Sequence, residues 1–147
     1  MVRRALATAL AALSLTGCEA AQAPAPEPTP RVSTRDCTRP SGVAPISFSA
    51  TKYPNIRRHF LRALRHGWPR VLRLHRPGAD DRRDALLADV PTRDGYDRDE
   101  YPPVVGRRRA PADVAYVPSS ENRSHGAVLG TKLRRFCEGT RFRYVFY

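Results

Sequence analysis

The stretch DVAYVPSSENRSHGAVLG, residues 113–130, changes from the pattern of a strand to that of a helix and so decides the class of fold. Residues 113–117 alternate in the way that is typical of a half-buried strand. Ser119 or Ser120 is suited to cap the N-terminus of a helix that begins near Glu121. The stretch therefore predicts a strand that leads directly into a helix.

The flanking segments complete the C-terminal half of the chain. Residues 98–105 are expected to be extended, and the helix is expected to end before Gly139, since glycine is favoured just beyond helix C-termini. The buried side chains of this helix are expected to be Leu129, Leu133 and Phe136. Residues 140–147 alternate as a strand with three aromatic residues on one face, Phe142, Tyr144 and Phe146. The predicted order is strand, strand, helix, strand.

Two helices are expected upstream. Residues 53–66 carry apolar side chains at helical spacing, Pro54 suits the first helical position, and Gly67 follows as a stop signal. A shorter helix is expected over residues 81–89, buried through Leu86 and Leu87. Together these patterns predict a small single α+β domain with N-terminal helices and a C-terminal β-β-α-β unit.

The N-terminus has the features of an export signal. Arg3 and Arg4 precede an apolar run over residues 5–15, which is too short to span a bilayer and suits the apolar region of a signal peptide. The run leads into Leu-Thr-Gly-Cys at residues 15–18, which looks like a bacterial lipobox with Cys18 as the lipid attachment site. An ordinary secretory signal with a chance cysteine is the alternative. In either case the mature protein is expected outside the cytoplasm.

A spacer is expected between this signal and the folded domain. Residues 19–30, EAAQAPAPEPTP, hold four prolines and little that could be buried, so they favour an extended, semi-rigid chain. We therefore expect a signal peptide over residues 1–18, a linker over residues 19–35 and a single domain over residues 36–147.

Cysteine content agrees with export. If Cys18 carries a lipid, Cys37 and Cys137 are an even pair in an oxidising compartment and are expected to form a disulfide. Two unpaired buried cysteines are the alternative. No Cys-x-x-Cys or Cys/His spacing indicates a zinc site.

The charge of the chain indicates a polyanionic partner. The net charge is +12 at pH 7, and arginine far outnumbers lysine among the basic residues. Such a surface binds phosphates with release of counterions, so nucleic acid is one candidate partner. The negative surface of a membrane or cell wall is the other.

An acidic cluster interrupts this basic chain at residues 94–100, where four of seven side chains are carboxylates. On an extended chain Asp97 and Asp99 point to the same side and Glu100 to the other. Like charges this close are costly unless a cation or arginines lie among them. Oxygen ligands suit magnesium, calcium or manganese. A solvated acidic loop paired with arginines is the alternative.

A second block of polar residues opens the helix, at residues 118–126. Glu121 and Asn122 supply oxygen ligands of the kind that hard metal ions prefer, and His125 lies four residues after Glu121 on the same face. The alternative is an ordinary helix start, in which Glu121 favours the helix dipole and pairs with Arg123 or His125.

The two blocks together resemble the NucA/NucB family of extracellular bacterial deoxyribonucleases. The resemblance rests on RDEYPP at residues 98–103, DVAYVPSSENRSHGA at residues 113–127 and GTRFRYVF at residues 139–146. It covers residues 96–147 closely and the upstream helices only loosely. The family is similar to the ββα-metal nucleases, in which two strands and a helix hold one divalent ion, so the resemblance implies that fold for this chain.

The resemblance also implies roles for individual residues. The family resembles the ββα-metal nucleases but has an aspartate as general base where most of them have a histidine, and this aspartate corresponds to Asp99. The family's helix motif corresponds to Glu121 and Asn122, which implies that these residues are metal ligands. Glu100 is then an auxiliary ligand or a residue of the catalytic group. The remaining candidates are His125 as a rival base or leaving-group acid, and Arg98 and Arg123 as phosphate contacts.

The resulting expectation is an exported endonuclease that hydrolyses DNA with Mg²⁺ or Mn²⁺. RNA stays open as a second substrate, and the protein is expected to be monomeric and extracellular, either secreted or held at the cell surface by the lipid on Cys18. Two alternatives remain: a non-catalytic DNA-binding or DNA-uptake lipoprotein, and a structural lipoprotein of the cell envelope. Sensitivity of DNA cleavage to EDTA separates the first expectation from both.

The lipobox gives a direct prediction. If Cys18 is lipidated, the protein should fractionate with membranes, because an acyl chain contributes about 0.8 kcal/mol of membrane affinity per buried methylene. Cys18→Ser should release the protein into the medium or leave it unprocessed, as immunoblots of membrane and supernatant fractions would show. Wild-type protein found only in the supernatant, without lipid on Cys18, would contradict the expected anchor.

Overall fold

A computed structural model of the chain describes residues 37–109 and 111–147. The expected signal peptide at residues 1–18 with its Cys18, and the expected linker at residues 19–35, lie outside the described residues. Within the described ranges, no helix is both long enough and apolar enough to cross a membrane.

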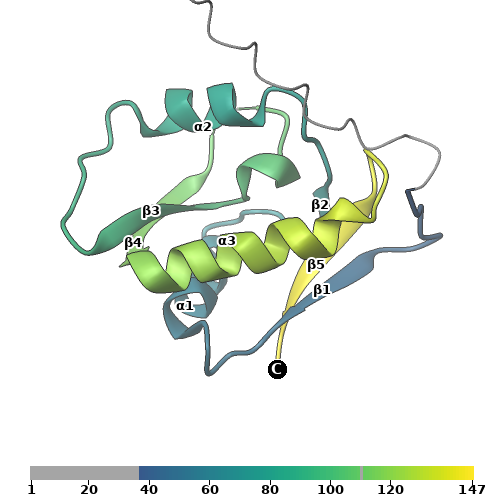
Figure 1. Cartoon of the computed structure of the whole chain (residues 1–147), viewed down its shortest axis with the longest axis horizontal. Coiled ribbons are helices and arrows are strands. Elements are labelled where there is room, and N and C mark those ends of the chain that lie inside the picture. The colour runs from purple at the N-terminus through teal and green to yellow at the C-terminus, as the bar shows by residue number, and fades with distance from the viewer. Residues whose placement is uncertain (1–36, 110) are drawn as a thin grey trace, which may run out of the picture. The chain divides into compact units, whose positions relative to one another are not determined.

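The folded part is a small α+β domain with three α-helices and two separate sheets (Figure 1). In chain order the elements are β1 (Ala44–Phe48), α1 (Pro54–Arg65), β2 (Leu72–Arg73), α2 (Ala79–Leu87), β3 (Tyr96–Tyr101), the short 3₁₀ helix η1 (Val104–Gly106), β4 (Asp113–Pro118), α3 (Ser119–Arg134) and β5 (Arg141–Phe146).

Each sheet is built differently. The first has the order β1-β5-β2, with β5 in the centre, parallel to β1 and antiparallel to β2. The second is the antiparallel pair β3–β4, in which Asp99 lies opposite Ala115 and Tyr101 opposite Asp113. Helix α3 follows β4 without a loop and lies between the two sheets in Figure 1.

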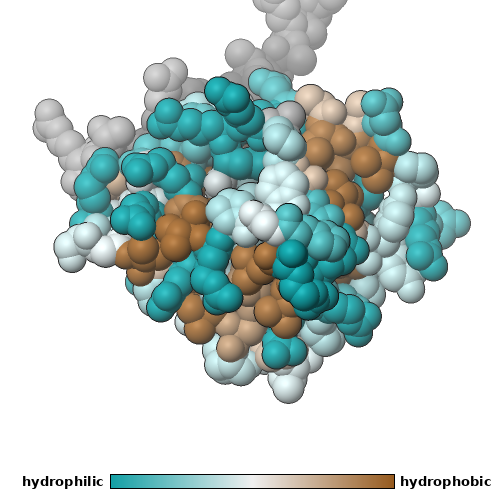
Figure 2. Space-filling model, turned by 180° about the vertical axis from the view of Figure 1, so that it is seen from behind, coloured by the Kyte–Doolittle hydropathy of each residue, from teal (hydrophilic) through white to brown (hydrophobic). Residues whose placement is uncertain are grey.

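Aromatic side chains of β5 form the centre of the core. Phe142 and Tyr144 are buried against residues of β1, α1 and α3, among them Phe48, Phe60 and Leu133. The opposite view of the molecule shows mostly hydrophilic residues with apolar surface between them (Figure 2). One continuous core of buried side chains connects both sheets to α1 and α3.

Several predicted elements are confirmed with small shifts at their ends. Helix α1 occupies residues 54–65 of the predicted 53–66, and β5 occupies residues 141–146 of the predicted 140–147. Both carry a clear periodicity of apolar residues, which is a strong local signal. Helix α2 covers residues 79–87 rather than 81–89, and of its two predicted core residues only Leu87 is fully buried.

The start of α3 differs from the prediction. The helix begins at Ser119, two residues earlier than expected, and neither serine caps it, because Pro118 occupies the N-cap position. The hydroxyl of Ser119 instead donates a hydrogen bond to Asp97 Oδ1 over 2.7 Å. The helix ends at Arg134, so the buried Phe136 lies just beyond it.

The expected extended segment over residues 98–105 is partly wrong. Strand β3 begins at Tyr96 and ends at Tyr101, and the chain then turns into η1. Pro102 and Pro103 explain the break, since proline has no backbone N–H for a strand ladder. Strand β1 was not predicted, because its five residues make their strand contacts with β5, nearly one hundred residues later.

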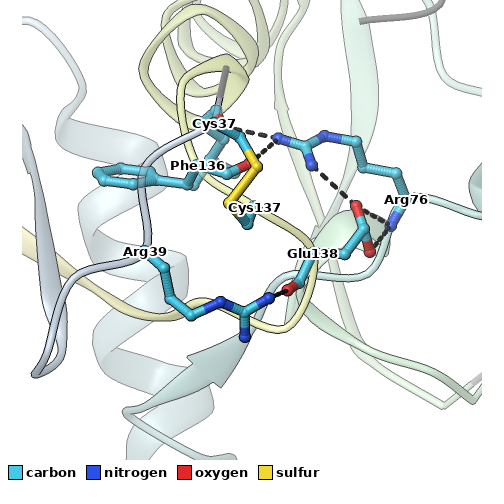
Figure 3. Close-up of a disulfide and its surroundings, with 7 residues drawn as sticks. Cys37, Arg39, Arg76, Phe136, Cys137 and Glu138 are labelled. Carbon is cyan, nitrogen blue, oxygen red and sulfur yellow. Dashed lines mark hydrogen bonds and ion pairs between the residues drawn. A yellow bond between two sulfur atoms is a disulfide. The ribbon is translucent and has the colours of Figure 1, made fainter. Parts of the chain in front are cut away.

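The predicted disulfide between Cys37 and Cys137 is present (Figure 3). Its surroundings hold the segment after α3 in place. The Arg76 guanidinium donates to the carbonyls of Leu133 and Phe136 and forms an ion pair with Glu138 over 2.8 Å. The disulfide thus ties the start of the described chain to a braced loop before β5.

Removal of this disulfide should lower stability strongly. The two cysteines are 100 residues apart, and closing a loop of that length is worth about 4–5 kcal/mol in the chain-entropy account. The double variant C37S/C137S should therefore lose about that much free energy of unfolding in a urea titration. A loss below about 1 kcal/mol would contradict a stabilising role for the disulfide.

Candidate active site

A pocket of about 400 Å³ lies where β3, η1 and α3 meet. Three arginines and three carboxylates line it together with an amide and an imidazole. These residues are Arg83, Arg98, Arg123, Asp97, Asp99, Glu100, Asn122 and His125. The pocket therefore gathers most of the residues that the sequence singled out, from both predicted blocks.

Asp99 is hydrogen-bonded to a residue that the sequence analysis did not identify. His59 Nδ1 donates a hydrogen bond to Asp99 Oδ2 over 2.5 Å. His59 lies on α1 and is buried, with 3% of its surface exposed. The available signal was a histidine among the apolar positions of an amphipathic helix, beside Phe60. Such a pattern is typical of a core residue and does not point to Asp99.

The far side of the His59 ring faces a second carboxylate. His59 Nε2 lies 3.8 Å from Asp113 Oδ2, beyond hydrogen-bond distance. Asp113 is in turn held by Arg62 of α1, whose Nη2 donates to Oδ1 over 2.8 Å. Helix α1 is thereby joined to both strands of the β3–β4 pair through polar side chains.

Asp97 is tied to the start of α3. It accepts hydrogen bonds from Ser119 Oγ over 2.7 Å and from Arg123 Nε over 3.1 Å. The hydrogen bond from Arg123 lowers the pKa of Asp97, and that from Ser119 lowers it further, against the opposing effect of partial burial. Asp97 is therefore a carboxylate that keeps Arg123 beside the pocket.

Glu100 has an arginine partner inside the protein. It is buried and forms an ion pair with Arg107 Nη2, while Arg83 Nε lies 3.9 Å from its other oxygen. A buried carboxylate needs such a partner, because removing an unpaired charge from water is costly. Glu100 lines the pocket, yet its charge is matched by the protein itself.

The two arginines predicted to bind phosphate are placed differently. Arg123 is largely exposed, with 76% of its side chain accessible, and lines the pocket. Arg98 also lines the pocket, but its Nη1 donates to the carbonyls of Leu87 and Val90 over 2.9 and 2.6 Å. The Arg98 guanidinium thus braces the end of α2, a use that its sequence neighbours did not indicate.

Glu121 is directed away from the pocket, contrary to its expected place beside Asn122. Its carboxylate accepts hydrogen bonds from the backbone N–H groups of Asn55 and Ile56 over 2.8 and 2.9 Å, and from Asn55 Nδ2 over 2.7 Å. It therefore caps the N-terminus of α1. Successive helical residues do not face the same side, so Asn122 lines the pocket while Glu121 faces α1.

His125 is a buried residue of the pocket lining and lies among aromatic rings. Its ring centroid is 4.4 Å from that of Phe48, and only 4% of its surface is exposed. Burial lowers the pKa of His125, although the nearby charges of Asp99 and Glu121 oppose the effect. Nε2 has no hydrogen-bond partner in the described part of the chain. His125 is therefore a neutral imidazole at neutral pH.

A metal ion could use only part of this site directly. Among the residues that the structure describes, no three His, Cys, Asp or Glu side chains are grouped so as to hold a metal ion. Asn122 lines the pocket together with Asp97 and Asp99, and its side chain donates a hydrogen bond that also lowers the pKa of Asp97. This donor set fits a hard cation that keeps most of its water ligands, as magnesium does.

Comparison with known proteins places the chain beside a nuclease. No family model matches the chain. The DNA-entry nuclease of Bacillus subtilis (strain 168) is 34% identical to it over 101 residues, which are 68% of this chain and 69% of that protein.

The position of Glu121 leads to a stability prediction. Glu121→Ala should lower the free energy of unfolding by about 1–3 kcal/mol even in EDTA, because the N-terminal N–H groups of α1 lose their acceptor. Ser120→Ala, at the exposed neighbouring position, is the control and should change stability by less than about 0.5 kcal/mol. If Glu121→Ala instead has normal stability in EDTA but is no longer stabilised by Mg²⁺, Glu121 is a metal ligand and not a helix cap.

Proposed function

Because this chain belongs to the NucA/NucB family of extracellular bacterial deoxyribonucleases, we propose that it is an exported endonuclease that hydrolyses DNA with the help of a divalent metal ion. One observation carries the proposal beyond family membership. Asp99, Asn122 and His125, from two separated blocks of sequence, line a single pocket with Arg123. A general base, an oxygen ligand for a metal ion and an arginine beside the phosphate are groups that can serve phosphodiester hydrolysis, and this pocket offers candidates for each.

The arrangement of the elements around this pocket supports a ββα-metal site. Strands β3 and β4 are an antiparallel pair, and α3 follows β4 directly. Asp99 lies on the first strand and Asn122 in the first turns of the helix. Two strands and a helix thus contribute the candidate base and the candidate ligand in the order that the family resemblance implies.

Asn122 is the residue that would hold the metal ion, here Mg²⁺ or Mn²⁺. A divalent cation bound there would stabilise the negative charge that develops on the phosphate and on the leaving oxygen. Glu121, the second expected ligand, is replaced in this proposal by water, since its carboxylate caps α1. The nearby Asp97 and Asp99 make the pocket attractive to a cation without each having to bind it.

Asp99 is the proposed general base and His125 its rival. Asp99 lines the pocket with a carboxylate that can accept a proton from the attacking water. The imidazole of His125 also lines the pocket and is neutral, but it is packed between the rings of Phe48, Tyr53 and Tyr144. We therefore assign the proton transfer to the more accessible Asp99.

Arg123 is the proposed phosphate contact. It is exposed beside the pocket, and the hydrogen bonds to Asp97 fix its guanidinium there. A guanidinium matches the geometry of a phosphate better than an ammonium group does. Arg83 lines the same pocket and takes the place proposed from sequence for Arg98, whose guanidinium is bound to backbone carbonyls.

Export accounts for the remaining features. A disulfide persists in an oxidising compartment, so Cys37–Cys137 agrees with a protein outside the cytoplasm. We propose an extracellular monomer, either secreted or attached to the membrane through a lipid on Cys18. DNA is the proposed substrate, and cleavage of RNA is a separate question for the same assay.

The test is cleavage of supercoiled plasmid by the purified protein, with Mg²⁺ or Mn²⁺ and with EDTA. The wild type should nick the plasmid only with metal. Asp99→Asn should bind DNA normally and lose about 10²–10⁴-fold in rate, the scale for removal of a general base. Asp94→Asn removes an exposed carboxylate of the same acidic cluster and should leave the rate unchanged.

His125→Ala distinguishes the two candidate bases. If it abolishes cleavage while Asp99→Asn stays within a few-fold of wild type, the base is His125 and the assignment of Asp99 is wrong. A wild-type protein that binds DNA with a strong salt dependence and never nicks it, with either metal, would instead indicate a non-catalytic DNA-binding protein.

A further inference from the structure

We propose that His59 is a positioning residue that aims Asp99 into the pocket, an inference that rests on the proposed role of Asp99 as general base. The 2.5 Å hydrogen bond from His59 Nδ1 occupies Asp99 Oδ2. Asp99 also lines the pocket, so its other oxygen is the one available to a water molecule there. His59 itself does not line the pocket and acts only through Asp99.

The position of His59 in α1 argues for a specific role. The residue lies on the buried face of the helix beside Ile56, Phe60 and Ala63, where an apolar side chain would pack without cost. A buried imidazole is unfavourable unless its polar atoms have partners. The Asp99 carboxylate is the only hydrogen-bond partner that the described structure shows for the imidazole, whose Nε2 has none.

The strand pairing explains how the ring is aligned. Asp99 on β3 is opposite Ala115 on β4, and Asp113 precedes Ala115 by two residues, so both aspartates project from the same face of the pair. His59 lies across that face with Nδ1 toward Asp99 and Nε2 3.8 Å from Asp113. The ring is therefore placed between two carboxylates on neighbouring strands.

Arg62, one helical turn after His59, completes the arrangement. Its guanidinium donates to both oxygens of Asp113 over 2.8 and 3.2 Å and to the carbonyl of Val114 over 3.0 Å. His66 Nδ1 lies 3.8 Å from the same carboxylate, at the end of α1. Asp113 is thus bound to α1 itself, the helix that carries His59.

The functional consequence is orientation of a carboxylate. The terminal torsion of an aspartate is broad, so an unrestrained Asp99 would sample many orientations of its two oxygens. One fixed hydrogen bond removes that freedom. Misplacement of a reacting group by about 1 Å is sufficient to lower a catalytic rate about 10²-fold. His59 should therefore affect the rate of the chemical step more than substrate binding.

Two amide variants separate positioning from packing. His59→Asn places its Nδ2 close to the position of the imidazole Nδ1 and can still donate to Asp99. His59→Gln reaches toward the position of Nε2 and cannot. Both replace the ring with a smaller amide, so a purely structural role would make their effects similar. We expect His59→Asn to stay within about fivefold of the wild-type kcat, and His59→Gln to lose about 10²-fold in kcat with KM changed less than threefold.

Nuclear magnetic resonance of the wild-type protein provides a test that does not depend on how the His59 variants fold. A His59 Nδ1 proton that is hydrogen-bonded to a carboxylate should resonate far downfield and be protected from exchange. Asp99→Asn should shift this signal upfield, while the control Asp94→Asn should leave it in place.

The outcomes separate this inference from the proposed function. If wild-type protein cleaves DNA but the two amide variants lose kcat equally, or change only KM, or if the Nδ1 signal ignores Asp99→Asn, His59 does not position Asp99. Failure of the wild type to cleave DNA with either metal would overturn the nuclease proposal itself.

Discussion

Every buried or half-buried carboxylate of the described structure is paired with a hydrogen-bond donor from another part of the chain, and the fold depends on these pairings. Glu121 accepts hydrogen bonds from the N-terminal N–H groups of α1, Asp99 accepts one from His59, and Asp113 accepts one from Arg62. Glu100 is paired with Arg107 in the interior. Desolvated carboxylates without such partners would each cost several kcal/mol. In a chain with a net charge of +12, arginines and backbone N–H groups are abundant enough to meet this requirement.

These pairings place α1 at the centre of the site although it contributes no predicted catalytic group. Its N-terminus is held by Glu121 of α3, and its middle is joined to β3 and β4 through His59 and Arg62. The three elements of the β3–β4–α3 unit are thus all connected to one helix. A small domain with a modest core gains rigidity in this way at the place where its proposed chemistry requires it.

The same pairings divide the acidic residues by role. Asp97 binds Arg123 beside the pocket, and Glu100 forms a buried ion pair with Arg107. Asp99 alone among the three is hydrogen-bonded to an imidazole. Part of the acidic cluster is therefore paired with arginines, as one of the two interpretations of the sequence held, and Asp99 is paired instead with a buried histidine.

The sequence by itself determined α1, α3, β4, β5 and the family, because periodicity and short motifs are properties of neighbouring residues. It determined the disulfide in another way, through an even pair of cysteines in a chain expected to be exported. Tertiary structure alone decided the pairing of β1 with β5, the orientation of Glu121 toward α1 and the contact of His59 with Asp99. Glu121 and the N–H donors of Asn55 are 66 residues apart, and His59 and Asp99 are 40 apart. A hydrogen-bond partner so distant in the chain is chosen by the packing of the elements, and no local pattern records it.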